Sequence, residues 1–310
     1  MKTALVTHDD CIRHEISPDH PECPQRIAAV RDALMKRDLY DFLHHHDATE
    51  ATYEHLLRAH PAAYLDLIHA KAPSSGSIQL DQDTAMNAFS LQAALLGAGA
   101  GVQATDLVLG GQAGNAFCLV RPPGHHAERI RAMGFCLFGN IAIAARHALE
   151  HHGLDRVAIL DFDVHHGNGT EDIVDGDARI LFCSSFQHPF YPGDYRADVD
   201  GQRVNVPLSA GTTGPAFRAA IEAAWMPALE RFAPQMLFVS AGFDAHAEDP
   251  LASLQLQDDD YAWITTRIMD LADRHADGRV VSMLEGGYAL PALGRSAAAH
   301  IRVMMGLDPG

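Results

Sequence analysis

Asp161, Asp163 and His165 alternate in the segment DFDVH, so an extended backbone places all three side chains on one side. Two of them could hold one metal ion, and Asp244 in the segment AGFDAH would supply a third ligand. Two carboxylates and one imidazole with an open coordination position are typical of a catalytic zinc site. Zn²⁺ fits best, although Fe²⁺, Co²⁺ and Mn²⁺ accept the same ligand types.

Two further segments carry groups suited to proton transfer. His125 and His126 follow a rigid Pro-Pro-Gly turn, and a neutral imidazole beside an activated water can accept its proton and later deliver it to a leaving amine. Tyr288 follows Gly286-Gly287, where its phenol could donate a hydrogen bond to an oxyanion. The histidine runs at 44–46 and 151–152 are interpreted as an exposed loop or helix face.

Short apolar runs and segments with helical spacing predict the elements that position these groups. Buried strands are expected in the runs that begin at Ala4, Asn115, Arg156, Arg179, Arg203, Gln235 and Arg279. Helical spacing appears after Pro24 and in segments 89–102, 141–149, 217–232 and 261–271, with a kink or restart expected at Pro227. Alternation of strands and helices predicts an α/β fold with a mainly parallel sheet.

The polar motifs follow four of the predicted strands. RPPGHH follows the strand that begins at Asn115, DFDVHHGNG follows that at Arg156, AGFDAH that at Gln235, and LEGGY that at Arg279. Ligands of open α/β sheets bind at the carboxyl ends of the strands, so these four motifs are expected to converge on one crevice.

Composition limits the class of protein. A chain of 310 residues, 47% of them hydrophobic, is expected to form one domain over residues 1–310. No run reaches the roughly 18 apolar residues of a membrane helix, and no signal peptide is evident, so a cytoplasmic address is predicted. Five widely spaced cysteines favour neither disulfides nor a thiolate zinc site.

The formal net charge of −17 disfavours nucleic acids and anionic membranes as partners. It would attract cationic molecules from solution, and acetylated basic peptides and acetylated polyamines suit that field. Net charge alone is also explained by solubility. The oligomeric state is left open.

Six motifs in order resemble those of the histone deacetylase and acetylpolyamine amidohydrolase superfamily, in its class II-like bacterial form. They are HPECPQR from His20, RPPGHHA from Arg121, GFCLFGN from Gly134, DFDVHHGNGT from Asp161, AGFDAHAEDP from Ala241 and LEGGY from Leu284. The resemblance implies an arginase-like fold, in which helices flank a central, mainly parallel sheet of eight strands.

The resemblance also implies the metal sites. Asp163, His165 and Asp244 would bind one catalytic zinc ion, for which Fe²⁺ or Co²⁺ could substitute. A structural potassium ion would be bound by Asp161, Asp163, His165, Ser185 and Phe186.

The family's catalytic roles carry over to five residues. Asp161 would orient His125, and His126 would face Asn168 and serve as general base and then general acid. Asn168 stands where class I enzymes carry aspartate, which would leave a protonated His126 less stabilised. Tyr288 would polarise the acyl carbonyl.

Five more residues would contact the substrate. Gly134 would accept the substrate amide N–H through its carbonyl, and Phe135 and Tyr191 would form the walls of a narrow tunnel. Arg26 would line the inner cavity through which acetate leaves. Leu251 at the tunnel mouth stands where some polyamine-selective relatives carry glutamate.

Together these residues predict a zinc-dependent deacetylase that hydrolyses an N-acyl amide, such as acetyl-lysine or a small acetylated amine, to acetate and a free amine. An acetylpolyamine amidohydrolase is the alternative, and Leu251 favours acyl-lysine over it. Asp81 or Asp83 is a candidate rim acid that grips a peptide backbone. A catalytically silent acetyl-lysine-binding module is less favoured because both histidines and Tyr288 are present. A two-metal manganese ureohydrolase would need more carboxylates.

Overall fold

An eight-stranded, all-parallel sheet forms the centre of the protein. We describe it from a computed structural model that covers residues 2–308. The strand order is β2-β1-β5-β10-β9-β6-β7-β8. The strands are β1 (Thr3–Thr7), β2 (His44–Asp47), β5 (Asn115–Leu119), β6 (Val157–Asp161), β7 (Ile180–Gln187), β8 (Arg203–Leu208), β9 (Leu237–Ala241) and β10 (Val280–Leu284). A separate antiparallel pair comprises β3 (Ser77–Gln79) and β4 (Ala85–Asn87). The predicted α/β class and eight-stranded parallel sheet are confirmed.

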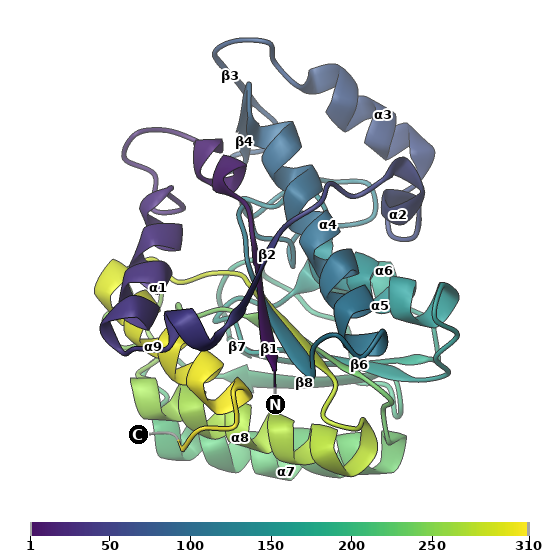
Figure 1. Ribbon diagram of the computed structural model, residues 1–310, viewed down its shortest axis with the longest axis vertical. Helices are drawn as coiled ribbons and strands as arrows, with labels where there is room; N and C mark the ends of the chain where they lie inside the picture. Colours follow the sequence, from purple (N-terminus) through teal and green to yellow (C-terminus); the bar gives the residue numbers. More distant parts are fainter. Residues whose placement is uncertain (1, 309–310) are drawn as a thin grey trace.

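Helices cover both faces of this sheet (Figure 1). They are α1 (Gln25–Lys36), α2 (Tyr53–Leu57), α3 (Ala62–Lys71), α4 (Ser90–Leu109), α5 (Asn140–Glu150), α6 (Asn168–Val174), α7 (Gly214–Phe232), α8 (Asp258–His275) and α9 (Leu290–Met304). Buried side chains of α4 and α5 belong to the core on one face, and those of α1, α7, α8 and α9 belong to the core on the other. The helix predicted at 217–232 does not restart at Pro227, since α7 is continuous across this residue. Its neighbours Met226 and Leu229 are buried.

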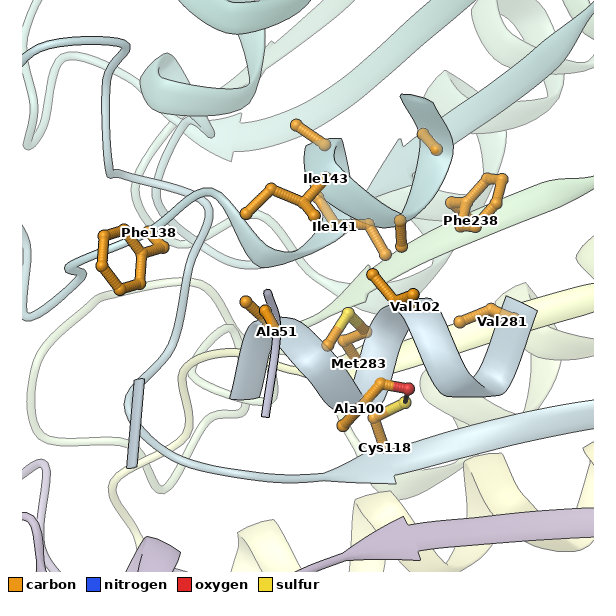
Figure 2. Close-up of a cluster of buried hydrophobic side chains, with 14 of the residues drawn as sticks. Ala51, Ala100, Val102, Cys118, Phe138, Ile141, Ile143, Phe238, Val281 and Met283 are labelled. Carbon is orange, nitrogen blue, oxygen red and sulfur yellow. Dashed lines mark hydrogen bonds between the residues drawn. The ribbon is translucent and has the colours of Figure 1, made fainter. Parts of the chain in front are cut away.

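Alternation along the central strands divides their side chains between these two cores. In β5, Ala116 and Cys118 face the core under α4 and α5, whereas Phe117 and Leu119 face the opposite core. Figure 2 shows α4 and α5 packed against each other, with side chains from β9 and β10 beneath them. Burial on both faces explains why these strands are continuous apolar runs.

Strand β2 is a departure from the sequence interpretation of residues 44–46. These histidines form a parallel edge strand, with Ala4 opposite His44 and Val6 opposite His46. His44 and His45 are exposed, as expected, but the segment is neither a loop nor a helix. Pairing with β1 decides its conformation, which no apolar pattern signals.

The four motif-bearing strands are neighbours in the order β5-β10-β9-β6. Because all four are parallel, their carboxyl ends lie at one edge of the sheet and bring the four motifs together. All five cysteines are free thiols, as predicted. No helix within residues 2–308 combines the length and apolar character needed to cross a bilayer.

Candidate active site

Asp163, His165 and Asp244 meet at the carboxyl edge of the sheet. Asp163 and His165 lie in the loop between β6 and α6, and Asp244 lies just after the neighbouring strand β9. His165 Nδ1 is 3.1 Å from Asp163 Oδ1 and 3.2 Å from Asp244 Oδ2. All three side chains are buried, so their ligand atoms face one small, water-poor space.

Backbone amides hold the two carboxylates in place. Gly286 N donates to Asp163 Oδ2 at 2.8 Å, and Val164 N donates to Asp244 Oδ1 at 2.9 Å. The other oxygen of Asp244, Oδ2, is buried, and within the described chain its polar neighbour is the His165 imidazole at 3.2 Å, without the geometry of a hydrogen bond. A buried carboxylate oxygen in that position lacks compensation unless a cation binds there.

The electrostatics of the trio also fit a cation. Burial, reinforced by Asp163, raises the pKa of Asp244 to about 7. Burial opposes protonation of His165, but its contacts with Asp163 and Asp244 outweigh this and raise its pKa to about 10. The shifts arise because two carboxylates are buried close together around one imidazole. A divalent ion would supply compensating positive charge, and the donor set of two carboxylates and one imidazole suits zinc.

Gly286 is required by the close approach of β10 to this trio. A Cβ atom at this position would lie 2.1 Å from Asp244 Oδ2 and 2.6 Å from Asp163 Oδ2. Any side chain would therefore displace the carboxylates. The glycine of the LEGGY motif thus shapes the candidate metal site directly.

His125 and His126 have opposite electrostatic environments. His125 Nδ1 is 3.0 Å from Asp161 Oδ2; burial opposes its protonation, but Asp163 and Asp161 raise its pKa well above the usual value. Burial and the neighbouring His125 and His165 hold the pKa of His126 well below its usual value. The two shifts favour a protonated His125 beside a neutral His126, and a general base must be neutral to accept a proton.

Asn168 fixes the tautomer of His126. Its Nδ2 donates to Glu128 Oε1 at 2.9 Å, which turns its Oδ1 toward His126 Nδ1 at 2.7 Å. The proton of His126 must then lie on Nδ1, and the lone pair of Nε2 remains free to accept another. The sequence placed Asn168 correctly but gave no signal for Glu128, whose role depends on tertiary contact.

Glu285 ties the histidine turn to β10. Its Oε2 accepts hydrogen bonds from Gly124 N at 2.7 Å and His125 N at 3.1 Å, and Ser240 Oγ donates to its Oε1 at 3.0 Å. Burial raises the pKa of Glu285 to about 7. The sequence analysis singled out Tyr288 in the same motif and missed this anchoring carboxylate.

Tyr288 lies near the trio at the end of the same loop. Asp249 Oδ2 accepts hydrogen bonds from Tyr288 N at 2.7 Å and Ala289 N at 3.1 Å, which fixes the backbone that carries the phenol. The Arg26 guanidinium lies 5.1 Å from the centre of the Tyr288 ring. Burial, reinforced by Asp244, raises the pKa of Tyr288 well above its usual value, so the phenol keeps its proton for donation.

Three of the predicted substrate-contacting residues surround His126 and Tyr288. A Cβ at Gly134 would lie 2.3 Å from the His126 ring, so the backbone of Gly134 passes directly against it. The Phe135 ring centre is 6.0 Å from that of Tyr288, and the Tyr191 ring is 5.1 Å from that of His126. Phe135 thus lies beside Tyr288, and Tyr191 lies beside His126.

Leu251 and Asp83 lie at the margin of this group. Leu251 is partly exposed, and its N–H donates to Asp249 Oδ1 at 3.0 Å. The suggested rim acid Asp83 instead accepts a hydrogen bond from Gly134 N at 3.0 Å, which places it on the loop that presents Phe135. Asp83 therefore stabilises the loop that contains Gly134 and Phe135.

Arg26 is fully buried behind Tyr288. Its Nε donates to the Gly287 carbonyl at 2.7 Å, and it pairs with Glu22 at 3.1 Å. Arg26 thus packs on the buried side of Tyr288.

The residues suggested for potassium lie along β6, β7 and the loop after β6. Asp161 pairs in register with Ser184, and Ser185 is the next residue of β7. Ser184 Oγ contacts His166 Nδ1 at 3.1 Å. Ser185 and Phe186 are both buried.

Comparison with known proteins extends over nearly the whole chain. The histone deacetylase domain family matches residues 20–304. The histone deacetylase-like amidohydrolase of Pseudomonas aeruginosa is 42% identical over 87% of this chain and 73% of its own length. The human polyamine deacetylase HDAC10 is 36% identical over the full chain and 49% of its own length. The crystal structure of the HDA15 HD domain superposes with a TM-score of 0.92 at 33% identity, covering 100% of this chain and 91% of that one.

Proposed function

The chain belongs to the histone deacetylase family, and from this we propose that it is a zinc-dependent deacetylase that hydrolyses N-acetylated lysine or a similar linear amide. The reaction adds water across the amide C–N bond and gives acetate and a free amine. The proposed catalytic domain comprises residues 1–310, and a cytoplasmic location accords with the sequence.

Asp163, His165 and Asp244 would hold the zinc ion, which when bound supplies a more acidic water and a polarised acyl carbonyl. His126 accepts the proton of the attacking water at Nε2, because its Nδ1 proton is engaged by Asn168. The new bond joins the water oxygen to the carbonyl carbon. Charged His125, held by Asp161, stabilises the negative charge that develops nearby.

Tyr288 donates a hydrogen bond to the carbonyl oxygen as it becomes an oxyanion. Such a donor typically contributes about 3 kcal/mol to stabilisation of the transition state. His126 then returns its proton to the amine nitrogen as the C–N bond breaks, which gives a neutral amine and acetic acid. The acid loses its remaining proton to solvent and leaves as acetate. Buried Arg26 offers a positive charge on the inner side of the site for the departing acetate.

The proposal rests above all on one arrangement: a neutral His126 beside two buried carboxylates and a histidine that share a cation-sized space. A catalytically silent binding module would not require a proton acceptor with a fixed tautomer. A second, potassium site built from Asp161, Asp163, His165, Ser185 and Phe186 is proposed from the family pattern alone.

The substrate would reach the site between Phe135 and Tyr191, with the Gly134 carbonyl accepting its amide N–H. Apolar Leu251 at the margin favours acetyl-lysine, because a secondary ammonium in a polyamine would gain no partner there. An acetylpolyamine amidohydrolase remains the second candidate, supported by similarity to a polyamine deacetylase.

Acetate release from acetyl-lysine peptides and from acetylated polyamines tests the proposal. We expect turnover of the peptides to exceed that of the polyamines, and Leu251→Glu to shift the preference toward polyamines. Higher activity on polyamines in the wild type would favour the second candidate. Binding of acetylated peptide without acetate release by the zinc-loaded protein would refute the proposed hydrolysis.

A further inference from the structure

We propose that Asp106, His147, His151 and His152 form a second transition-metal site, of the zinc type, separate from the active site. The four residues offer ligand atoms that all lie within 4.8 Å of one another. Asp106 belongs to the last turn of α4, and the three histidines belong to the end of α5 and the residues after it. The cluster therefore joins the carboxyl ends of two helices packed side by side (Figure 1).

The side chains converge on the Asp106 carboxylate. His147 Nε2 and His152 Nε2 are each 2.7 Å from Asp106 Oδ1. The His147 and His151 rings, one helical turn apart, stack with centres 4.8 Å apart and planes 11° from parallel. The centre of the His152 ring is 5.0 Å from that of His151.

This arrangement is incomplete as a network of hydrogen bonds alone. His147 is nearly fully buried and meets Asp106 through Nε2, the atom that would bind the ion. Asp106 Oδ1 is also contacted by the imidazoles of both His147 and His152, while the ring of His151 stacks on that of His147. Three imidazoles that surround a carboxylate are more simply explained as ligands of one ion.

The ligand set matches the chemistry of zinc. Three imidazoles and one carboxylate complete a tetrahedral Zn²⁺ site, and imidazole also suits Cu²⁺ and Ni²⁺. Bonds of about 2.0–2.1 Å place tetrahedral ligand atoms roughly 3.4 Å apart. Two of the present separations are 2.7 Å and the others are at most 4.8 Å, so movements of roughly 1 Å would bring the ligand atoms to tetrahedral spacing. Asp106 is half-exposed, and His152 is partly exposed, which leaves an ion access from solvent.

The surroundings favour a cation. Both helices end here, so their carbonyl ends contribute partial negative charge. Arg58, whose charge acts on His147, is paired with Glu54 at 3.7 Å and Glu150 at 3.4 Å, so its charge is largely compensated. A bound ion would link α4 to α5 through side chains and stabilise their packing on the sheet.

The proposed site lies at the opposite end of α5 from the active site. Asn140, the first residue of α5, contacts the Pro122 carbonyl in the histidine turn at 3.3 Å, and the 11-residue helix extends roughly 16 Å away from it. Removal of the second site should therefore leave hydrolysis intact.

Equilibrium dialysis against Zn²⁺ tests the inference, with metal content measured per chain. The wild type should bind two tight equivalents, and the His151→Gln/His152→Gln variant should bind one, with affinity for the other reduced about 100-fold or more. Asp244→Asn should retain the equivalent held by the cluster, and Zn²⁺ should raise the melting temperature of that variant. The matched control His44→Gln/His45→Gln, which changes exposed histidines on β2, should still bind two.

Only one tight equivalent in the wild type, or two in His151→Gln/His152→Gln, would overturn the second site. Asp106→Asn provides an independent check, because it removes the shared carboxylate and leaves every histidine in place. Acetate release measured on the same samples separates the two proposals. Normal hydrolysis by protein that binds a single equivalent of Zn²⁺ would refute the second site but not the deacetylase function. Two bound equivalents without hydrolysis would refute the deacetylase function but not the second site.

Discussion

Asp249 is a positioning residue whose removal should impair turnover through Tyr288. Its two carboxylate oxygens accept three backbone N–H groups, those of Tyr288 at 2.7 Å, Ala289 at 3.1 Å and Leu251 at 3.0 Å. Asp249→Asn keeps the size of the side chain but leaves one neutral oxygen for these donors. The loop that carries Tyr288 would lose part of its anchoring while Asp163, His165 and Asp244, the proposed metal ligands, stay in place.

The size of the effect follows from the two hydrogen bonds on the Tyr288 side. Hydrogen bonds to a charged acceptor contribute about 1.5–3 kcal/mol each, against about 0.5–1.5 kcal/mol for neutral ones. Neutralising Asp249 therefore costs about 1 kcal/mol per bond, or about 2 kcal/mol in total. If the whole loss of about 2 kcal/mol raises the activation free energy, turnover falls roughly 30-fold, since each factor of ten corresponds to about 1.4 kcal/mol.

Steady-state kinetics on an acetyl-lysine peptide measure this effect. We expect kcat to fall about 10- to 30-fold with KM changed by less than about threefold, since the proposed role of Tyr288 is to stabilise the transition state rather than to bind the substrate. Glu248→Gln is the matched control, because Glu248 is exposed and pairs with Arg295 instead. Its kcat should stay within about twofold of the wild type.

A double-mutant cycle determines whether Asp249 acts through Tyr288. In a Tyr288→Phe background, Asp249→Asn should reduce kcat by less than about threefold, because the hydroxyl that it positions is already absent. An equal reduction in both backgrounds would refute the positioning role. Unchanged kcat in correctly folded Asp249→Asn would refute it as well.

Further predictions concern the proton shuttle, the oxyanion donor and acid stability. Tyr288→Phe should lower kcat about 100-fold or more while the substrate dissociation constant changes less than about tenfold, and near-normal turnover would exclude Tyr288 as the donor. His126→Ala should lower kcat about 100-fold or more without loss of metal, whereas His125→Ala should be milder; the reverse ranking would exchange their roles. Burial lowers the pKa of His300 to about 3, so below its ordinary value of 6.5 the unfolded chain binds a proton that the folded chain does not. The free energy of unfolding should therefore fall as pH decreases from about 6.5 toward 3. Urea titrations at a series of pH values measure this fall, and per pH unit it should be smaller in His300→Gln than in the wild type by up to about 1.4 kcal/mol. An equal fall in both proteins would contradict this.

Much of the fold and the metal trio could be predicted because they rest on local patterns. Continuous apolar runs ending in Asp, His and Gly motifs identified strands such as β6 and β9, and parallel strands must bring those ends together. Strand β2 could not be predicted, because the sequence HHHD has no apolar alternation and is extended only through pairing with β1.

The anchoring carboxylates were missed for a related reason. Asp249 reaches Tyr288 across 39 residues, Glu285 reaches Gly124 across 161, and Glu128 reaches Asn168 across 40. Each carboxylate contacts backbone N–H groups or a side-chain amide, which occur throughout any sequence. The sequence near the carboxylate therefore does not indicate which group it will contact. The cluster around Asp106 was likewise hidden, because His151 and His152 gain their partners only when α5 packs against α4.

The central claim is that hydrolysis depends on a metal ion held by Asp163, His165 and Asp244. Its most direct test is acetate release from an acetyl-lysine peptide by chelator-stripped protein as Zn²⁺ is added back. We predict no turnover without metal, recovery on addition of Zn²⁺, and no comparable recovery in Asp244→Asn. Full turnover by rigorously metal-free wild-type protein would contradict the account.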